Sequence, residues 1–126
     1  MTEEPRDYDL EFTAAVTHRI RRRLGFDSER GDVRRFVLQL EYYHDDEWHT
    51  VVRYDHDGTG ESEFSHDVPE EGLHIDIYRD GEKEATEYVT GPQPAALALD
   101  RAEDHLSENL QRFITRYEKW HEINNR

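Results

Sequence analysis

The stretch VRRFVLQLEYYHDDEWHTVVRYD, residues 33–55, decides the fold. Over residues 33–43 apolar and polar side chains alternate, which is the two-residue period of a half-buried strand. Residues 48–55 form a second run of this kind, separated from the first by the polar segment 44–47. Two such runs joined by a short polar turn predict an antiparallel hairpin.

More strands are expected after this hairpin. Residues 73–78 alternate again, and Asp80-Gly81 is a strong two-residue turn signal, with residues 84–89 as the return strand. A short strand is also indicated at residues 64–66. Together these runs predict an antiparallel sheet of about four to five strands over residues 33–89.

Helices are expected before and after the sheet along the chain. Before it, apolar residues recur at every fourth position, which predicts a helix over residues 8–24 with Gly25 as its C-cap. These apolar residues are Phe12, Val16, Ile20 and Leu24. After it, apolar spacings of three and four predict a long helix over residues 94–123. A helix of roughly 40 Å should either break near Ser107–Asn109 or project and pair with a second copy.

The sequence therefore predicts one α+β domain over residues 1–126, in which an antiparallel sheet is flanked by an N-terminal helix and a long C-terminal helix. Residues 1–7 are expected to be flexible. Cysteine is absent, which excludes disulfides, a thiol nucleophile and a thiolate metal site. No apolar stretch has the length of a membrane span and the start is no signal peptide, so we expect a cytoplasmic protein with no membrane contact.

The charge of the chain indicates salt adaptation. There are 30 acidic and 16 basic residues, for a net charge of -14, and only Lys83 and Lys119 among the basic residues are lysines. Self-repulsion at this charge destabilises a compact state in dilute buffer, whereas at molar salt the Debye length is roughly 3 Å and the repulsion is screened. This composition resembles that of proteins from halophilic archaea. An ordinary acidic protein is the alternative, but acidity alone does not explain the shortage of lysine.

The predicted strands place a set of polar side chains on one face of the sheet. If strands 48–55 and 73–78 are neighbours, the residues between their apolar positions share this face. The face would hold His49, Arg53, Asp55, His74, Asp76 and Tyr78, with His56 and His66 at its rim.

Such a face has the groups for metal-independent RNA cleavage by internal transfer. One histidine can take the proton of a ribose 2′-hydroxyl and a second can protonate the leaving oxygen, while an arginine stabilises charge on the phosphorane. The candidate catalytic residues are Arg53, Asp55, His56, His66 and His74. No cofactor is needed, and no metal is expected because the histidine and aspartate spacing matches no recognised metal site. The alternative is that this is only the solvated face of an antiparallel sheet.

A basic stretch, Arg19–Arg23, is unusual in so acidic a chain. It could contact nucleic acid or an acidic partner. The alternative is that these arginines complement a helix dipole and form salt bridges with the plentiful carboxylates.

Two resemblances bear on function. The segment Arg53–Lys83 resembles a family of small haloarchaeal proteins, and the resemblance extends over residues 35–120. Arg53-Tyr54-Asp55 after a hairpin, followed by a histidine-containing loop and a C-terminal helix, is similar to TumE-type toxins of toxin–antitoxin pairs, although the histidine spacing departs from that pattern. This second resemblance implies a ribonuclease toxin that acts on RNA and is neutralised by a helix-turn-helix antitoxin, with His56, His66 and His74 as counterparts of the toxin histidines.

A different class of function is also consistent with the sequence. The apolar stripe on the predicted helix over residues 94–123 could pair with a second copy. The chain would then be a non-catalytic protein–protein interaction or dimerisation module, present as a homodimer.

Overall fold

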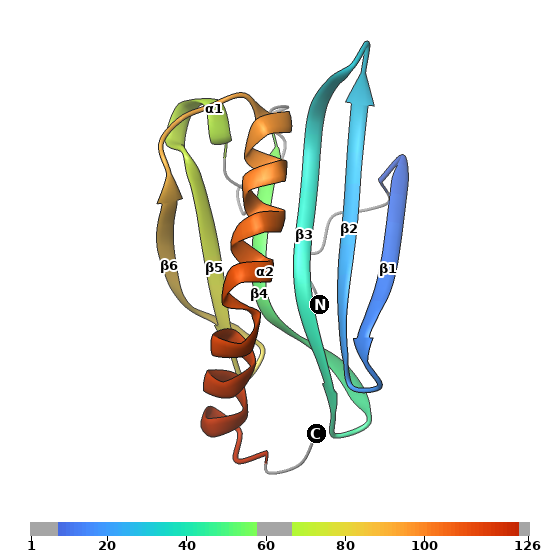
Figure 1. Cartoon of the computed structure of the whole chain (residues 1–126), viewed down its shortest axis with the longest axis vertical. Helices are drawn as coiled ribbons and strands as arrows, with labels where there is room; N and C mark the ends of the chain where they lie inside the picture. Colours follow the sequence, from blue (N-terminus) through green and yellow to red (C-terminus); the bar gives the residue numbers. More distant parts are fainter. Residues whose placement is uncertain (1–7, 58–66, 124–126) are drawn as a thin grey trace.

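The computed structural model describes residues 8–57 and 67–123, which form a six-stranded antiparallel sheet with a long helix across one face (Figure 1). In chain order the elements are β1 (Leu10–Thr17), β2 (Ile20–Glu29), β3 (Asp32–His44), β4 (Glu47–Asp57), α1 (Val68–Glu71), β5 (Leu73–Arg79), β6 (Glu82–Thr90) and α2 (Ala95–Trp120). Each strand pairs with the next in chain order, so the sheet runs from β1 at one edge to β6 at the other. The predicted α+β class, antiparallel sheet and long C-terminal helix are confirmed, but the sheet has six strands. The strand predicted at residues 64–66 lies outside the described residues.

The N-terminal helix predicted over residues 8–24 is wrong, because this segment forms β1 and the first half of β2. A spacing of four residues fits the strand period of two as well as the helix period of about 3.6. Leu10 and Ala14 complete a two-residue alternation with Phe12, which the helical interpretation left unused. In the observed register Phe12 lies opposite Leu24 on the neighbouring strand.

Gly25 is accordingly not a helix cap but a close-contact position inside β2. The ring of Tyr8 packs directly on it, and a Cβ added at Gly25 would lie 2.8 Å from Tyr8 Cδ2. Tyr8 is in turn covered by Arg35, whose guanidinium carbon lies 4.3 Å from the ring centroid. The absence of a side chain at Gly25 thus lets an aromatic ring pack against the sheet.

Tight turns fix the register of three hairpins. The central residues of each turn both have positive φ: 55° and 86° at Arg30-Gly31, 53° and 66° at Asp45-Asp46, and 55° and 79° at Asp80-Gly81. This geometry is that of type I′ turns, whose twist matches that of the flanking strands. The predicted hairpin within residues 33–55 and the predicted turn at Asp80-Gly81 are both confirmed.

A β-bulge in β4 changes which side chains face α2. Leu40 pairs with Val52 but Glu41 pairs with Thr50, so Val51 is an extra residue that shifts the alternation. Before the bulge, His49 lies opposite Tyr42, whose ring stacks on Tyr117 of α2. The prediction that His49 lies on the polar face is therefore wrong.

The same bulge moves Trp48 to the face away from α2, although a regular alternation with Val52 and Tyr54 would place it on the core face. There it contacts Tyr43, at 5.3 Å between ring centroids, and Arg21, whose guanidinium carbon lies 4.0 Å from its ring centroid.

The core lies between α2 and one face of the sheet. α2 packs on β3, β4 and β5 with the side chains Ala98, Leu99, Ala102, Leu106, Phe113, Ile114 and Tyr117. The helix is continuous over 26 residues and does not break near Ser107–Asn109. Its length of roughly 39 Å is matched by β3, whose 13 residues span roughly 43 Å. Within the described ranges no helix is long and apolar enough to cross a membrane.

Candidate functional site

The apolar face of the sheet extends beyond the area that α2 covers. Leu10 and Phe12 of β1 lie opposite Phe26 and Leu24 of β2, which in turn lie opposite core residues of β3. We call these four residues, Leu10, Phe12, Leu24 and Phe26, the β1–β2 apolar patch. Phe12 is 55% exposed and Leu10 48%, whereas Leu24 and Phe26 pack partly against the core. Figure 1 shows β1 and β2 beside α2 rather than beneath it.

The two edges of the sheet differ in how they are protected. β6 carries four charged residues in nine: Glu82, Lys83, Glu84 and Glu87. β1 has only Glu11 in eight residues, and neither proline nor lysine. Charged residues and proline on an edge strand oppose pairing with another chain. Among the residues that the structure describes, the β1 edge thus lacks the charged protection against strand addition that the β6 edge has.

The arginines of β2 are partly neutralised within the chain. Arg21 Nε lies 2.6 Å from Glu41 Oε1, and Arg22 Nη2 lies 2.8 Å from Glu103 Oε2 on α2. Because this segment is a strand, the helix-dipole alternative for Arg19–Arg23 is wrong. The salt-bridge alternative holds for Arg21 and Arg22.

Arg53 and Asp55 share the sheet face that points away from α2, as predicted. Both are buried, with 5% and 1% of their surface exposed, and Arg53 Nε lies 3.1 Å from Asp55 Oδ2. Arg53 lies opposite Asp76 on β5. Asp76 accepts a hydrogen bond of 2.8 Å from the Thr86 hydroxyl and lies 3.3 Å from Lys83 Nζ. The face therefore holds a buried network of opposite charges.

The predicted histidines are divided between the two faces. His74 lies two residues before Asp76, so it shares the face of Arg53, and its ring meets Tyr88 at 5.7 Å between centroids. His56 lies opposite Phe36 on the α2 side, where it is buried and its Nδ1 accepts a hydrogen bond of 3.0 Å from the Val68 amide. His66 lies outside the described residues. The structure thus brings Arg53, Asp55 and His74 to one face and places His56 on the other, while their catalytic role stays a prediction.

Three histidines and a tyrosine form a cluster that sequence reasoning missed. The rings of His44 and His49 stack at 4.1 Å between centroids, and those of Tyr117 and His121 stack at 4.0 Å. His44 Nε2 lies 2.9 Å from the Tyr117 hydroxyl, so the β3–β4 hairpin is joined to the end of α2. His121 also contacts Asp80, whose amide donates to His121 Nε2 at 3.1 Å. The spacing of Tyr117 and His121 placed them on one helix face, but nothing in the sequence linked them to His44.

The electrostatics of this cluster favour the uncharged forms of His44 and Tyr117. Burial and the neighbouring His49 lower the pKa of His44 below its ordinary value of 6.5, against the opposing effect of Asp45. Burial raises the pKa of Tyr117 above its ordinary value of 10.0. Both ring nitrogens of His44 have protein neighbours. Its Nε2 contacts the Tyr117 hydroxyl, and its Nδ1 lies 3.2 Å from Asp45 Oδ2. This arrangement favours a structural role for the cluster of His44, His49, Tyr117 and His121, which we call the histidine clasp, over an acid–base site.

The described residues contain no group of three or more histidine, aspartate or glutamate side chains that could hold a metal ion.

Comparison with known proteins assigns a family but no activity. Searches of curated proteins and of solved structures found no match. A family model described as "Domain of unknown function (DUF7718)" matches residues 2–123, which is nearly the whole chain. The chain belongs to this DUF7718 family.

Proposed function

We propose that this chain is a non-catalytic interaction module that forms a homodimer by joining the β1 strands of two copies. The observation that carries the proposal is the exposed apolar side of β1 next to an edge without charged protection. Two β1 strands related by a twofold axis would run antiparallel, so the same side chains would meet from both copies. Burying half-exposed Leu10 and Phe12 would then stabilise the dimer by roughly 1 kcal/mol per side chain.

A strand interface is favoured over pairing through α2. The apolar side of α2 is already buried against the sheet in side chains such as Leu106 and Phe113, and is not available to a second copy. The β1 strand is also among the least acidic parts of a chain whose net charge is -14. Approach of two copies along β1 therefore meets less repulsion than approach along β6.

Size-exclusion chromatography of the full chain in molar KCl, with light scattering to measure the mass, tests this proposal. The wild type should elute as a dimer and Phe12→Lys as a monomer, because a charge at Phe12 would be buried without a partner in the interface. Leu97→Lys is the matched control, since Leu97 on α2 is 53% exposed but lies outside the patch. A monomeric wild type, or equal loss of the dimer in both variants, would contradict the proposal.

A metal-independent ribonuclease toxin is the second candidate, with RNA as substrate and a helix-turn-helix antitoxin as partner. It is favoured by the buried Arg53–Asp55 pair and by His74 on the same face, because clustered buried charges are typical of functional sites. Purified protein with EDTA in molar KCl should then cleave RNA. His74→Ala should lose about 100-fold or more of the rate, and His18→Ala, in the exposed β1–β2 turn, should lose none. Intact RNA with the wild type would refute this candidate.

Salt adaptation and a cytoplasmic location accompany both candidates. The support for salt adaptation is the net charge of -14 together with only two lysines among 16 basic residues. At molar salt the screened repulsion would permit the compact sheet and its dimer.

A further inference from the structure

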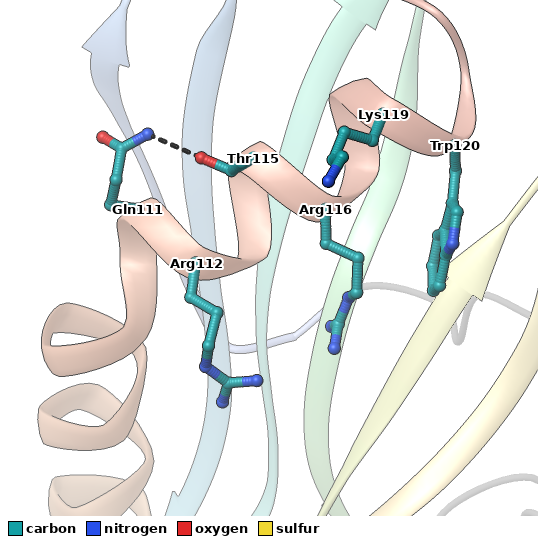
Figure 2. Close-up of a pocket in the computed structure, with 6 residues that line it drawn as sticks. All are labelled: Gln111, Arg112, Thr115, Arg116, Lys119 and Trp120. Carbon is teal, nitrogen blue, oxygen red and sulfur yellow. Dashed lines mark hydrogen bonds between the residues drawn. The ribbon is translucent and has the colours of Figure 1, made fainter.

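The last turns of α2 carry a cationic groove on a protein whose net charge is -14. Figure 2 shows two rows of side chains along the last turns of the helix, which together line an open groove of about 550 Å³. The lining residues are Gln111, Arg112, Thr115, Arg116, Lys119 and Trp120. We call this feature the α2 groove. It is formed by α2 alone, whereas the β1–β2 apolar patch lies on the first two strands.

The cations of the α2 groove have no acidic partners in the part of the chain that the structure describes. The ion pairs found there use other arginines, Lys83 and two histidines. None of them involves Arg112, Arg116, Lys119 or the neighbouring Arg79. In a chain with 30 acidic and only 16 basic residues, four neighbouring cations without an ion pair among the described residues are unexpected. Their mutual repulsion destabilises the empty groove.

Aromatic rings rather than carboxylates hold these cations in place. The guanidinium carbons of Arg116 and Arg79 lie 5.2 Å and 5.0 Å from the ring centroid of Trp120, and that of Arg112 lies 4.9 Å from the ring centroid of Phe113. Such contacts stabilise a cation but do not neutralise its charge. The positive charges of these side chains are therefore not cancelled by ion pairs among the described residues.

Arg116 is the most strained member of the group. Its Nη2 is buried and has no hydrogen-bond partner among residues 8–57 and 67–123. Burial and the charge of Arg112 lower the pKa of Arg116, against the opposing effect of Glu87 on β6. A buried donor without an acceptor destabilises the fold, and an anion that accepts from this nitrogen would remove the cost.

We propose that the α2 groove binds single-stranded nucleic acid through its phosphates. Arg112, Arg116 and Lys119 recur about once per helical turn, which places cations in a row with steps of roughly 4.5–6 Å along the helix. The arginine fork matches phosphate oxygens, and Trp120 at the end of the row offers an aromatic surface beside them. Gln111 and Thr115, which hydrogen-bond to each other at 3.0 Å, supply neutral donors along the other row.

Fluorescence anisotropy of a labelled octauridylate tests this proposal with the full chain. If three phosphates are contacted, a fourfold rise in KCl should weaken wild-type binding by about 20-fold. Arg112→Ala/Arg116→Ala should bind far more weakly and lose only about 3-fold over the same change, because one contact remains. Arg101→Ala is the matched control, since it removes an exposed cation from the same helix outside the groove, and it should bind as the wild type does.

Several outcomes would overturn the proposal. An octa-aspartate peptide that competes as well as the RNA would assign the groove to acidic peptides instead. Uridine monophosphate that binds as tightly as the octauridylate would contradict a strand lying along the row. No binding by the wild type, or equal loss in Arg101→Ala and in the double variant, would also contradict it, provided that circular dichroism shows all variants folded.

Discussion

Phe12 of β1 lies directly opposite Leu24 of β2, on the side of the sheet where α2 packs further along. Leu24 reaches the edge of the core, whereas Phe12 keeps 55% of its surface exposed. The apolar surface therefore continues past the last side chain that α2 covers and ends at an open strand edge. This relationship is the basis for proposing that β1 meets a second β1.

Gly25→Ala should destabilise the protein. A methyl group at this position would lie 2.8 Å from Tyr8 Cδ2, so the ring must move, and we expect a loss of about 1–3 kcal/mol. In a strand without this contact the same change should be mildly stabilising, by about 0.5 kcal/mol. Urea unfolding in molar KCl measures the effect.

The double variant Tyr8→Ala/Gly25→Ala provides the control for this prediction. If the Tyr8 ring is the cause, Gly25→Ala should cost little once Tyr8 has been replaced. An equal cost in both backgrounds would show that the packing of Tyr8 on Gly25 is not responsible.

The histidine clasp should make stability fall in mild acid. Because the pKa of His44 is lowered in the folded state, the unfolded chain takes up a proton near pH 6.5 that the folded chain resists. The contribution of His44 is therefore fully present above pH 6.5 and is lost as the pH falls below it. His105, whose pKa is lowered mainly by burial, acts in the same direction.

Thermal unfolding of His44→Gln against pH checks this prediction. The variant should lose less stability than the wild type between neutral pH and about pH 5, while His18→Gln in the exposed β1–β2 turn should follow the wild type. A pH dependence that is the same in all three proteins would mean that the clasp does not sense protonation.

Salt should stabilise the fold. With a net charge of -14, repulsion between carboxylates weakens the folded state in dilute buffer and is screened as KCl increases. The melting temperature should therefore rise steadily from low to molar KCl. A melting temperature that is flat or falls over this range would refute salt adaptation.

The sequence predicted correctly those elements whose apolar pattern fits only one type of secondary structure. The alternation through residues 33–43, the turn at Asp80-Gly81 and the apolar stripe of α2 all define their structures locally. The segment 8–24 failed because apolar residues at every fourth position satisfy both helix and strand, and only the intervening Leu10 and Ala14 distinguish them. In the structure β2 pairs with both β1 and β3, and these pairings are not encoded in the apolar spacing of the segment itself.

The candidate site was less predictable for the same reason. Arg53, Asp55 and His74 were placed correctly on one face, because β4 and β5 do pair as assumed. The bulge at Val51 leaves no signature in the sequence, yet it moves His49 to the other face. The distance between His44 and Tyr117 along the chain, 73 residues, likewise hid the histidine clasp.

Hydrogen exchange of the β1 backbone amides at low and high protein concentration tests the central proposal most directly. In a single copy, alternate amides of this edge strand point away from β2 and should exchange rapidly. The account predicts that these amides become protected as the concentration rises, and that Phe12→Lys abolishes the protection while Leu97→Lys preserves it. Rapid exchange of the same amides at every concentration in molar KCl would contradict the β1 dimer.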